Sequence, residues 1–345
     1  MTWFINDKRT WTQRVFGNML LNGPVPKHVA IIMDGNRRYA KVRNIKKIEG
    51  HISGFEKLVE ALNWCFTMGI KEVSVYAFSI ENFKRSQEEV DALFDLAREK
   101  FQRLLNEKEK IDELKVCVRF FGNISLLPHD LQVIISKVVE MTKNYNNLFM
   151  NVCIAYTSRD EITMAIRDIC EGVKKNNIHL SDINENLIEN SLYTNNSYDV
   201  DLLVRTSGEV RLSDFLLWQS SFSVLTFVKQ MWPEFSIWNF YMAILNYQLN
   251  FDQIHKLKIS LKNRIENDLQ TSCKMFVIEN RKELVDKLKN KGIDDQEDLQ
   301  QLAKHVANEA IENSIRQHKD RSQSFLDNLN SKRDSFFHQI ATSVN

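Results

Sequence analysis

Glycine and proline are scarce in this sequence. The 345 residues contain 10 glycines and 4 prolines, well below the roughly 12% that these two types reach in average proteins. Such a composition favours helices and leaves little flexible linker. The apolar runs are also short, none approaching the ~18–20 residues of a membrane-spanning helix, and the N-terminus lacks the basic-then-apolar pattern of a signal peptide. The sequence therefore predicts a helix-rich protein that is soluble or held only at a membrane surface.

Charge of one sign and clustered metal ligands are also missing. Lys and Arg total 46 against 45 Asp and Glu, a net charge of +1, so no nucleic acid partner held by bulk charge is expected. The five cysteines form no CxxC pair, and an odd number in a chain of this size indicates reduced thiols. The eight histidines form no HExxH motif, which argues against a zinc site. Any anion must be bound by a local cluster.

Short β-branched runs alternate with longer helical patterns along the chain. We predict six strands, over Val29–Met33, Glu72–Phe78, Val116–Phe121, Phe149–Ala155, Asp201–Val204 and Val224–Val228. We predict helices near residues 51–68, 86–112, 129–146, 159–175 and 183–192, two of which begin with capping-box patterns, at Ser86–Glu89 and Ser158–Glu161. Because apolar strands alternate with helices, the predicted fold is α/β, with a central, mostly parallel six-stranded sheet flanked by helices.

Two segments flank a main domain that we place at residues 23–250. Residues 1–22 predict an amphipathic helix, which either lies in a membrane interface or covers an apolar cavity of its own domain. Its apolar residues are Trp3, Phe4, Trp11, Val15, Phe16, Met19, Leu20 and Leu21. After Pro233 the chain has no proline and a single glycine, Gly292, so residues 251–345 predict a C-terminal helical hairpin with its turn at Lys291–Asp295. We interpret this hairpin as a solvated extension rather than a second active domain.

Three arginine-bearing segments each follow directly on a predicted strand. They are Asp34–Arg38, Ser79–Arg85 and Arg205–Ser213. The carboxyl ends of parallel strands share one edge of the sheet, where ligands bind, so their five arginines (37, 38, 85, 205 and 211) are expected to converge. Each alone fits an ordinary surface ion pair, but five together indicate a site for an anion of several charges.

Asp34 is a carboxylate among these arginines. One carboxylate beside phosphate oxygens is a common way to hold Mg²⁺, although Asp34 could also only neutralise Arg37 or Arg38. Neither a P-loop nor a GxGxxG pattern is present, so a magnesium diphosphate fits better than a nucleotide. Apolar residues of the two nearest predicted helices either form ordinary core or enclose a hydrocarbon tunnel. They are Phe55, Leu58, Trp64, Leu93, Phe94, Leu96, Phe101, Leu104 and Leu105.

At these residues the chain resembles the cis-prenyltransferases, the undecaprenyl and dehydrodolichyl diphosphate synthases, and within them the eukaryotic enzymes. The resemblance runs from about residue 22 to 250 with the motifs in family order. The matching segments are His28–Ala40, Gly50–Gly54, Tyr76–Arg85, Arg205–Gln219 and Trp232–Glu234. The resemblance implies an enzyme that adds isopentenyl diphosphate units in cis to an allylic starter, farnesyl diphosphate, for dolichol synthesis and protein glycosylation.

The resemblance also implies roles for single residues. Asp34 would bind Mg²⁺ together with the allylic diphosphate, which Gly35, Asn36, Arg37, Arg38 and Arg85 would hold. Arg205, Arg211 and Ser213 would bind isopentenyl diphosphate, with Arg38 shared between the two. His51, Ser79 and Asn82 match polar positions around the reacting carbons. No residue stands out as the proton acceptor, and His51 fits a phosphate donor or a packing residue as well as a catalyst.

Two departures from the bacterial pattern suggest a partner. Val224 stands where homodimeric bacterial relatives carry a glutamate, and residues 245–258 lack their C-terminal Arg-x-Gly motif. These losses suggest that a Nogo-B-receptor-like subunit completes the site in a heteromer. The resemblance further implies that this chain is in peripheral contact with the endoplasmic reticulum membrane on its cytoplasmic side. Two other hypotheses remain. A non-catalytic isoprenoid-binding subunit is disfavoured because Asp34–Arg38 is intact, and an unrelated phosphate-binding protein would not explain the ordered motifs.

Overall fold

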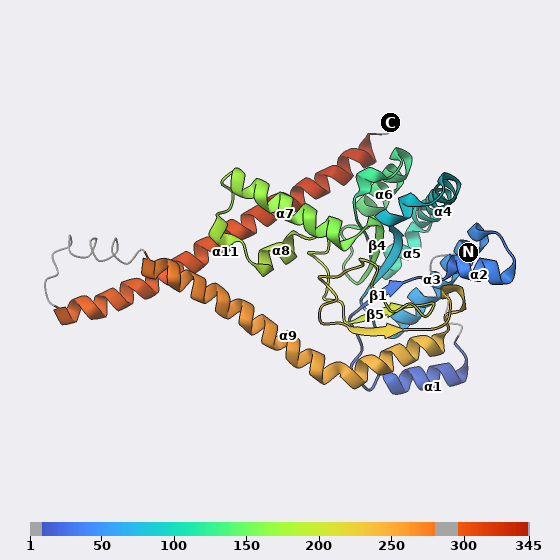
Figure 1. Cartoon of the computed structure of the whole chain (residues 1–345), viewed down its shortest axis with the longest axis horizontal. Helices are drawn as coiled ribbons and strands as arrows, with labels where there is room; N and C mark the ends of the chain where they lie inside the picture. The colour runs from blue at the N-terminus through green and yellow to red at the C-terminus, as the bar shows by residue number, and fades with distance from the viewer. Residues whose placement is uncertain (1–8, 280–295, 344–345) are drawn as a thin grey trace. The chain divides into compact units, whose positions relative to one another are not determined.

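The computed structural model describes residues 9–279 and 296–343. Six strands form one sheet in the order β3-β4-β2-β1-β5-β6, and every neighbouring pair is parallel (Figure 1). The strands are β1 (His28–Ile32), β2 (Glu72–Ser79), β3 (Val116–Phe121), β4 (Leu148–Tyr156), β5 (Leu202–Arg205) and β6 (Val224–Phe227). The predicted fold class is confirmed, and each predicted strand agrees within one residue at either end.

The helices differ from the prediction in two respects. Their bounds are α2 (Asn36–Arg43), α3 (Lys47–Thr67), α4 (Gln87–Asn106), α5 (Lys108–Leu114), α6 (His129–Thr142), α7 (Ser158–Lys174) and α8 (Glu185–Ser191). Helix α2 was not predicted, because its charged sequence has no apolar periodicity. The single helix predicted over 86–112 is wrong, since the chain breaks at Glu107 between α4 and α5.

Both predicted capping boxes are also wrong. Ser86 makes no side-chain cap bond to α4. The Glu89 carboxylate, the other half of the predicted box, contacts basic side chains instead. At α7 the cap is Thr157, whose hydroxyl accepts from Asp160 N at 3.3 Å. Glu161 is buried, accepts from Tyr156 Oη at 2.5 Å, and has a pKa raised by burial.

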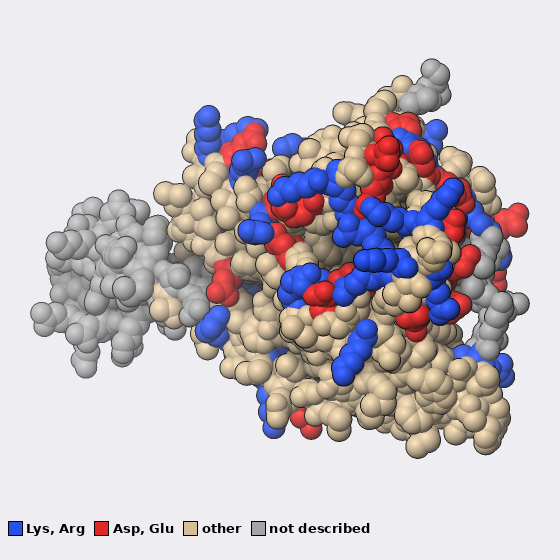
Figure 2. Space-filling model, turned by 45° about the vertical axis from the view of Figure 1, so that its right-hand side comes forward, with Lys and Arg blue, Asp and Glu red and all other residues tan. Residues whose placement is uncertain are grey.

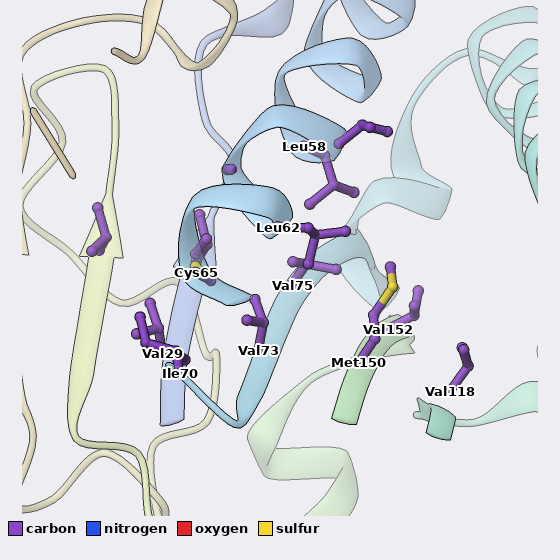
Figure 3. Packing of buried hydrophobic residues seen from close by; sticks show 14 of the residues in the cluster. Val29, Leu58, Leu62, Cys65, Ile70, Val73, Val75, Val118, Met150 and Val152 are labelled. Atoms are coloured by element: carbon purple, nitrogen blue, oxygen red, sulfur yellow. The ribbon is translucent and has the colours of Figure 1, made fainter. Parts of the chain in front are cut away.

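The main core lies between the sheet and helices α3, α4 and α6. Figure 3 shows Leu58 and Leu62 of α3 facing Val73 and Val75 of β2. On the opposite face, residues of β1, β3, β4 and β5 form a second apolar cluster with Phe215 and Leu216 of the segment after β5. Burial on both faces explains why β1 is apolar almost throughout.

The chain divides into two compact units. The first comprises residues 1–165, 192–255 and 332–345 and carries the sheet, and the second comprises residues 166–191 and 256–331. In the second unit the buried carboxylate of Asp182 accepts from His318 Nδ1 at 2.9 Å and from two guanidinium nitrogens of Arg321.

Two long helices follow the sheet, as predicted. They are α9 (Ile237–Glu279) and α11 (Gln296–Thr342). The predicted turn at Lys291–Asp295 lies outside the described residues. Helix α9 runs through residues 245–258 without a break, which is where the resemblance places the missing Arg-x-Gly motif.

The N-terminal helix α1 (Trp11–Leu20) begins with a capping box formed by Thr10 and Gln13. Its apolar residues divide between two faces. Phe16 packs on Trp238 and Tyr241 of α9, with ring centroids 5.6 and 5.7 Å apart, and Leu20 is buried. The exposed face carries Trp11, Val15, Met19 and Leu21, whereas Trp3 and Phe4 lie outside the described residues. Across the described part of the chain, no helix has the length and apolarity needed to cross a membrane.

Candidate active site

The sheet order brings the three arginine-bearing segments together, because β2, β1 and β5 are neighbours. Their carboxyl ends open into a cavity of about 690 Å³, within the range of roughly 300–1,000 Å³ usual for ligand sites. Figure 2 shows a face where lysine and arginine side chains, interspersed with acidic ones, crowd around a hollow. The candidate residues lining the cavity are Asp34, Asn36, Arg37, His51, Ser79, Asn82, Arg85, Arg205, Arg211 and Ser213.

A first cluster of charges lies beside β1 and β2 and consists of Arg37, Lys47, His51, Arg85 and Glu89. The Glu89 carboxylate joins its three cations. Oε1 lies 3.1 Å from Arg85 Nη1 and 3.5 Å from Arg37 Nη1, while Oε2 lies 3.1 Å from Lys47 Nζ. Arg37 and Arg85 line the cavity and Glu89 does not. The carboxylate therefore sits behind two guanidinium groups that face the ligand space.

The same charges set the protonation of His51. Burial and the neighbouring Arg85 and Arg37 lower the pKa of this imidazole from 6.5 to about 4, although Glu89 partly offsets them. Its Nε2 atom is buried and has no hydrogen-bond partner among the described residues. At neutral pH the ring is uncharged, so Nε2 can form one hydrogen bond with a ligand. It donates in one tautomer and accepts in the other.

A second cluster lies beside β1 and β5 and consists of Arg38, Arg205, Glu209, Arg211 and Ser213. The side chain of Arg205 is only 4% exposed and donates to Ser213 Oγ at 2.6 Å and to the Arg211 carbonyl. Glu209 bridges Arg38, at 3.2 Å, and Arg211. Arg205 is thus fixed by the fold, whereas the side chain of Arg211 is 66% exposed and is paired with Glu209.

Asp34 contacts two arginines of the second cluster and lies near Arg85 of the first. Its Oδ2 accepts from Arg205 Nη2 at 2.8 Å, and its Oδ1 is 3.5 Å from Arg38 Nη2. The side chain of Thr206 holds the Asp34 backbone from both sides, accepting from its N–H and donating to its carbonyl. Among the described residues no group of three or more metal-ligating side chains occurs. Asp34 lines the cavity wall together with Glu81 and Asp214, and a carboxylate there fits Mg²⁺ that takes its other ligands from diphosphate and water.

Helix α2 begins at the cavity and depends on Gly35. This residue has a φ of +108°, and a Cβ there would meet Ser207 Oγ at 2.8 Å. The first turn of α2 carries Asn36, Arg37 and Arg38, whose location at a helix N-terminus favours a bound anion. Of the candidate residues, Gly35 and Arg38 do not line the cavity wall themselves.

Ser79 and Asn82 are partly used by the backbone. Asn82 Oδ1 accepts from Ser79 N, and Ser79 Oγ accepts from Glu81 N, in the 3₁₀ turn η1 (Ile80–Lys84). This turn places Arg85 directly before α4. Both side chains line the cavity. The Asn82 amide NH₂ group can donate to a ligand, while the Ser79 hydroxyl also makes a hydrogen bond with Tyr76.

Apolar side chains from α3, α4 and the strands form the rest of the cavity wall. Of the residues considered for a tunnel, those that line it are Phe55, Leu58, Leu93, Phe94, Leu96 and Phe101. Trp64 packs against Phe235 and Phe240 instead, and Leu104 belongs to the buried core. An apolar chamber therefore adjoins the two charged clusters.

Glu89 and Glu209 were missed by sequence reasoning. Glu89 did stand out in the sequence, but as part of a helix cap. Glu209 lies between Arg205 and Arg211 in the sequence. This alternation of charge was the one feature that could have indicated an ion pair of Glu209 with these arginines. No periodicity reveals which arginine a loop carboxylate will contact.

Comparison with known proteins identifies the family. Residues 32–255 match the family model described as putative undecaprenyl diphosphate synthase. The chain is 53% identical over 258 residues, 75% of its length and 78% of the relative's, to the dehydrodolichyl diphosphate synthase complex subunit DHDDS of Homo sapiens. It is 41% identical over 253 residues, 72% of its length and 96% of the relative's, to a dehydrodolichyl diphosphate synthase complex subunit of Schizosaccharomyces pombe.

A solved structure agrees with these relatives. Lavandulyl diphosphate synthase from Lavandula x intermedia, in complex with dimethylallyl diphosphate, superimposes with a TM-score of 0.62 at 32% identity. The match covers 65% of this chain and 95% of that one. The predicted family is confirmed: this chain belongs to the cis-prenyltransferases and is a transferase.

Proposed function

We propose that the chain is the catalytic subunit of a dehydrodolichyl diphosphate synthase, adding isopentenyl diphosphate units in cis to farnesyl diphosphate for dolichol synthesis and protein glycosylation. The observation that carries the proposal is one cavity that joins two arginine clusters to an apolar chamber. The relatives named dehydrodolichyl diphosphate synthase complex subunits support the choice of product class.

The reaction needs two diphosphates held side by side. The first cluster, with Gly35 and Asn36, would hold the allylic diphosphate, and the second would hold isopentenyl diphosphate, with Arg38 between them. The C1–O bond of the allylic substrate breaks and its electron pair leaves with the diphosphate. C1 then bonds to C4 of isopentenyl diphosphate, which loses a proton from C2. Cations already in place stabilise the charge on the leaving oxygens.

Asp34 is the residue that would hold Mg²⁺. When bound there, the ion would neutralise part of the diphosphate charge. Arg205 fixes the Asp34 carboxylate at 2.8 Å and so orients it toward the ligand space. His51, Ser79 and Asn82 would contribute hydrogen bonds near the reacting carbons, and the leaving diphosphate itself is a candidate proton acceptor.

A second subunit would complete the enzyme. Val224 stands where bacterial relatives carry a glutamate, and residues 245–258 lack the Arg-x-Gly motif. In the structure Val224 is buried at the start of β6, and α9 continues through residues 245–258. We propose a Nogo-B-receptor-like partner and peripheral contact with the endoplasmic reticulum membrane through the exposed face of α1, with Trp11 77% and Met19 63% exposed.

The test is product formation from farnesyl diphosphate, labelled isopentenyl diphosphate and Mg²⁺, with the chain alone and with the partner subunit. Long cis-polyprenyl products only with the partner are expected. Equal activity alone would keep the chemistry and refute the need for a partner. No products in either mixture would favour the alternative, a non-catalytic isoprenoid-binding subunit.

A further inference from the structure

Glu89 joins four elements of the first cluster. Through one carboxylate it connects Arg37 of α2, Lys47 of α3 and Arg85 after η1 to its own helix α4. Its side chain is 10% exposed, and the three cations lower its pKa despite the opposing effect of burial. It is therefore ionised at neutral pH and enclosed by basic groups.

The two cavity-lining arginines repel each other without this carboxylate. Burial and the nearby Arg37 lower the pKa of Arg85, which Glu89 opposes. Each guanidinium group has five N–H donors in a rigid fork. A bond from Nη1 to Glu89 fixes the plane of the fork and leaves other donors for the cavity. Glu89 can thus orient both arginines while the ligand is bound.

We propose that Glu89 is a positioning residue for the condensation, holding Arg37 and Arg85 in the orientation that stabilises the departing allylic diphosphate. The inference rests on the proposed function. Two effects of removing the charge oppose each other. The cavity becomes more positive, which strengthens binding of a diphosphate in the ground state. The arginines also lose their alignment, which slows the chemical step because charge develops on the leaving oxygens in the transition state. A slower chemical step without weaker substrate binding is the distinguishing signature.

The test compares Glu89→Gln with Glu88→Gln, which removes the same charge from an exposed position on the first turn of α4. Each variant is assayed with its partner subunit for the single-turnover rate of the first condensation and for the Kd of farnesyl thiodiphosphate, a non-reacting analogue. We expect Glu89→Gln to lower the rate about 10- to 30-fold with a Kd that stays the same or falls. Glu88→Gln should stay within about twofold of the wild type in both.

A double-mutant cycle with Arg85→Ala separates positioning from a general structural role. If Glu89 acts through Arg85, the two rate losses are clearly non-additive. The proposal would be overturned if Glu89→Gln and Glu88→Gln had equal rates. It would also be overturned if the rate losses of Glu89→Gln and Arg85→Ala were additive and came with weaker analogue binding and a lower Tm. If Glu89→Gln does not fold, Glu89→Asp, which keeps the charge but shortens the reach by one carbon, must show the same loss of rate. Absence of condensation by the wild-type complex would instead refute the proposed function.

Discussion

The two arginine clusters at the mouth of the cavity are built differently. In the second, Arg205 is buried and bonded to Asp34, Ser213 and a backbone carbonyl. In the first, Arg37 and Arg85 depend on a single carboxylate from a neighbouring helix. The second cluster is thus anchored by the loop that carries it, and the first by contacts between elements.

This difference suits the two proposed ligands. The allylic diphosphate leaves after each condensation and is replaced by the diphosphate of the lengthened chain, so its cluster must accept a returning group repeatedly. Isopentenyl diphosphate enters afresh each time. The exposed Arg211 side chain is accessible to each entering molecule, while buried Arg205 is held by its bonds to the fold. The following predictions test this contrast, from the largest expected effect to the smallest.

Removing the Asp34 carboxylate should have the largest effect. Asp34→Ala deprives buried Arg205 of its carboxylate partner and the site of its candidate metal ligand, so we expect turnover to fall by at least about 10³-fold with the fold retained. The measurement is steady-state condensation at saturating Mg²⁺, with circular dichroism as a check on folding. Near-normal rates would contradict the role of Asp34.

Removing the exposed arginine of the second cluster should affect one substrate. We expect Arg211→Ala to raise the KM for isopentenyl diphosphate about 30-fold, because a charge-assisted contact is lost, and to leave the KM for farnesyl diphosphate within about twofold. Initial rates over a matrix of both substrate concentrations measure this. An unchanged KM for isopentenyl diphosphate would refute the assignment.

His51 should make the first cluster sensitive to acid. Its folded pKa of about 4 lies below the unfolded value of 6.5, so the unfolded state binds more protons between these values and stability falls as the pH drops from 6.5 toward 4. The full shift corresponds to about 3 kcal/mol, which partial exposure of the ring reduces to about 2 kcal/mol. Urea unfolding at pH 7 and pH 5 should show that His51→Gln loses part of this pH dependence. An identical dependence in both proteins would exclude His51 as its source.

The smallest expected effect is the difference in stability loss between alanine substitutions at two glycines, Gly35 and Gly208. Both have positive φ, but a Cβ at Gly35 would lie 2.8 Å from Ser207 Oγ and 3.1 Å from the Met231 backbone, whereas at Gly208 nothing lies within 4 Å among the described residues. We expect Gly208→Ala to cost about 1 kcal/mol of stability and Gly35→Ala about 1–2 kcal/mol more. Equal losses in urea unfolding would show that crowding at Gly35 is unimportant.

The sheet and the meeting of the arginines could be predicted from sequence because both follow from position along the chain. Apolar strands such as β1 are continuous in sequence, and parallel topology forces their carboxyl ends to one edge. The same reasoning predicts that Asp34, Arg85 and Arg205 meet, and all three line one cavity.

The partners of these residues could not be predicted in the same way. Glu89 has the sequence of a helix cap, yet its carboxylate binds three cations from other elements because a charge-assisted contact outweighs a cap bond worth about 1 kcal/mol. Helix α2 was missed because ligand-facing charges replace the apolar stripe that a pattern detects. The inner face of α1 likewise depends on Trp238 and Tyr241, more than 200 residues away.

The central claim is that the two clusters hold different diphosphates, and crossed binding tests it most directly. Equilibrium titration of the wild type, Arg85→Ala and Arg211→Ala would use isopentenyl diphosphate and farnesyl thiodiphosphate separately, with Mg²⁺ and the partner subunit present. We predict that Arg85→Ala weakens only the farnesyl analogue and Arg211→Ala weakens only isopentenyl diphosphate, each by about tenfold or more. If both variants weakened the same ligand, or each weakened both equally, the division of the site into two diphosphate clusters would be wrong.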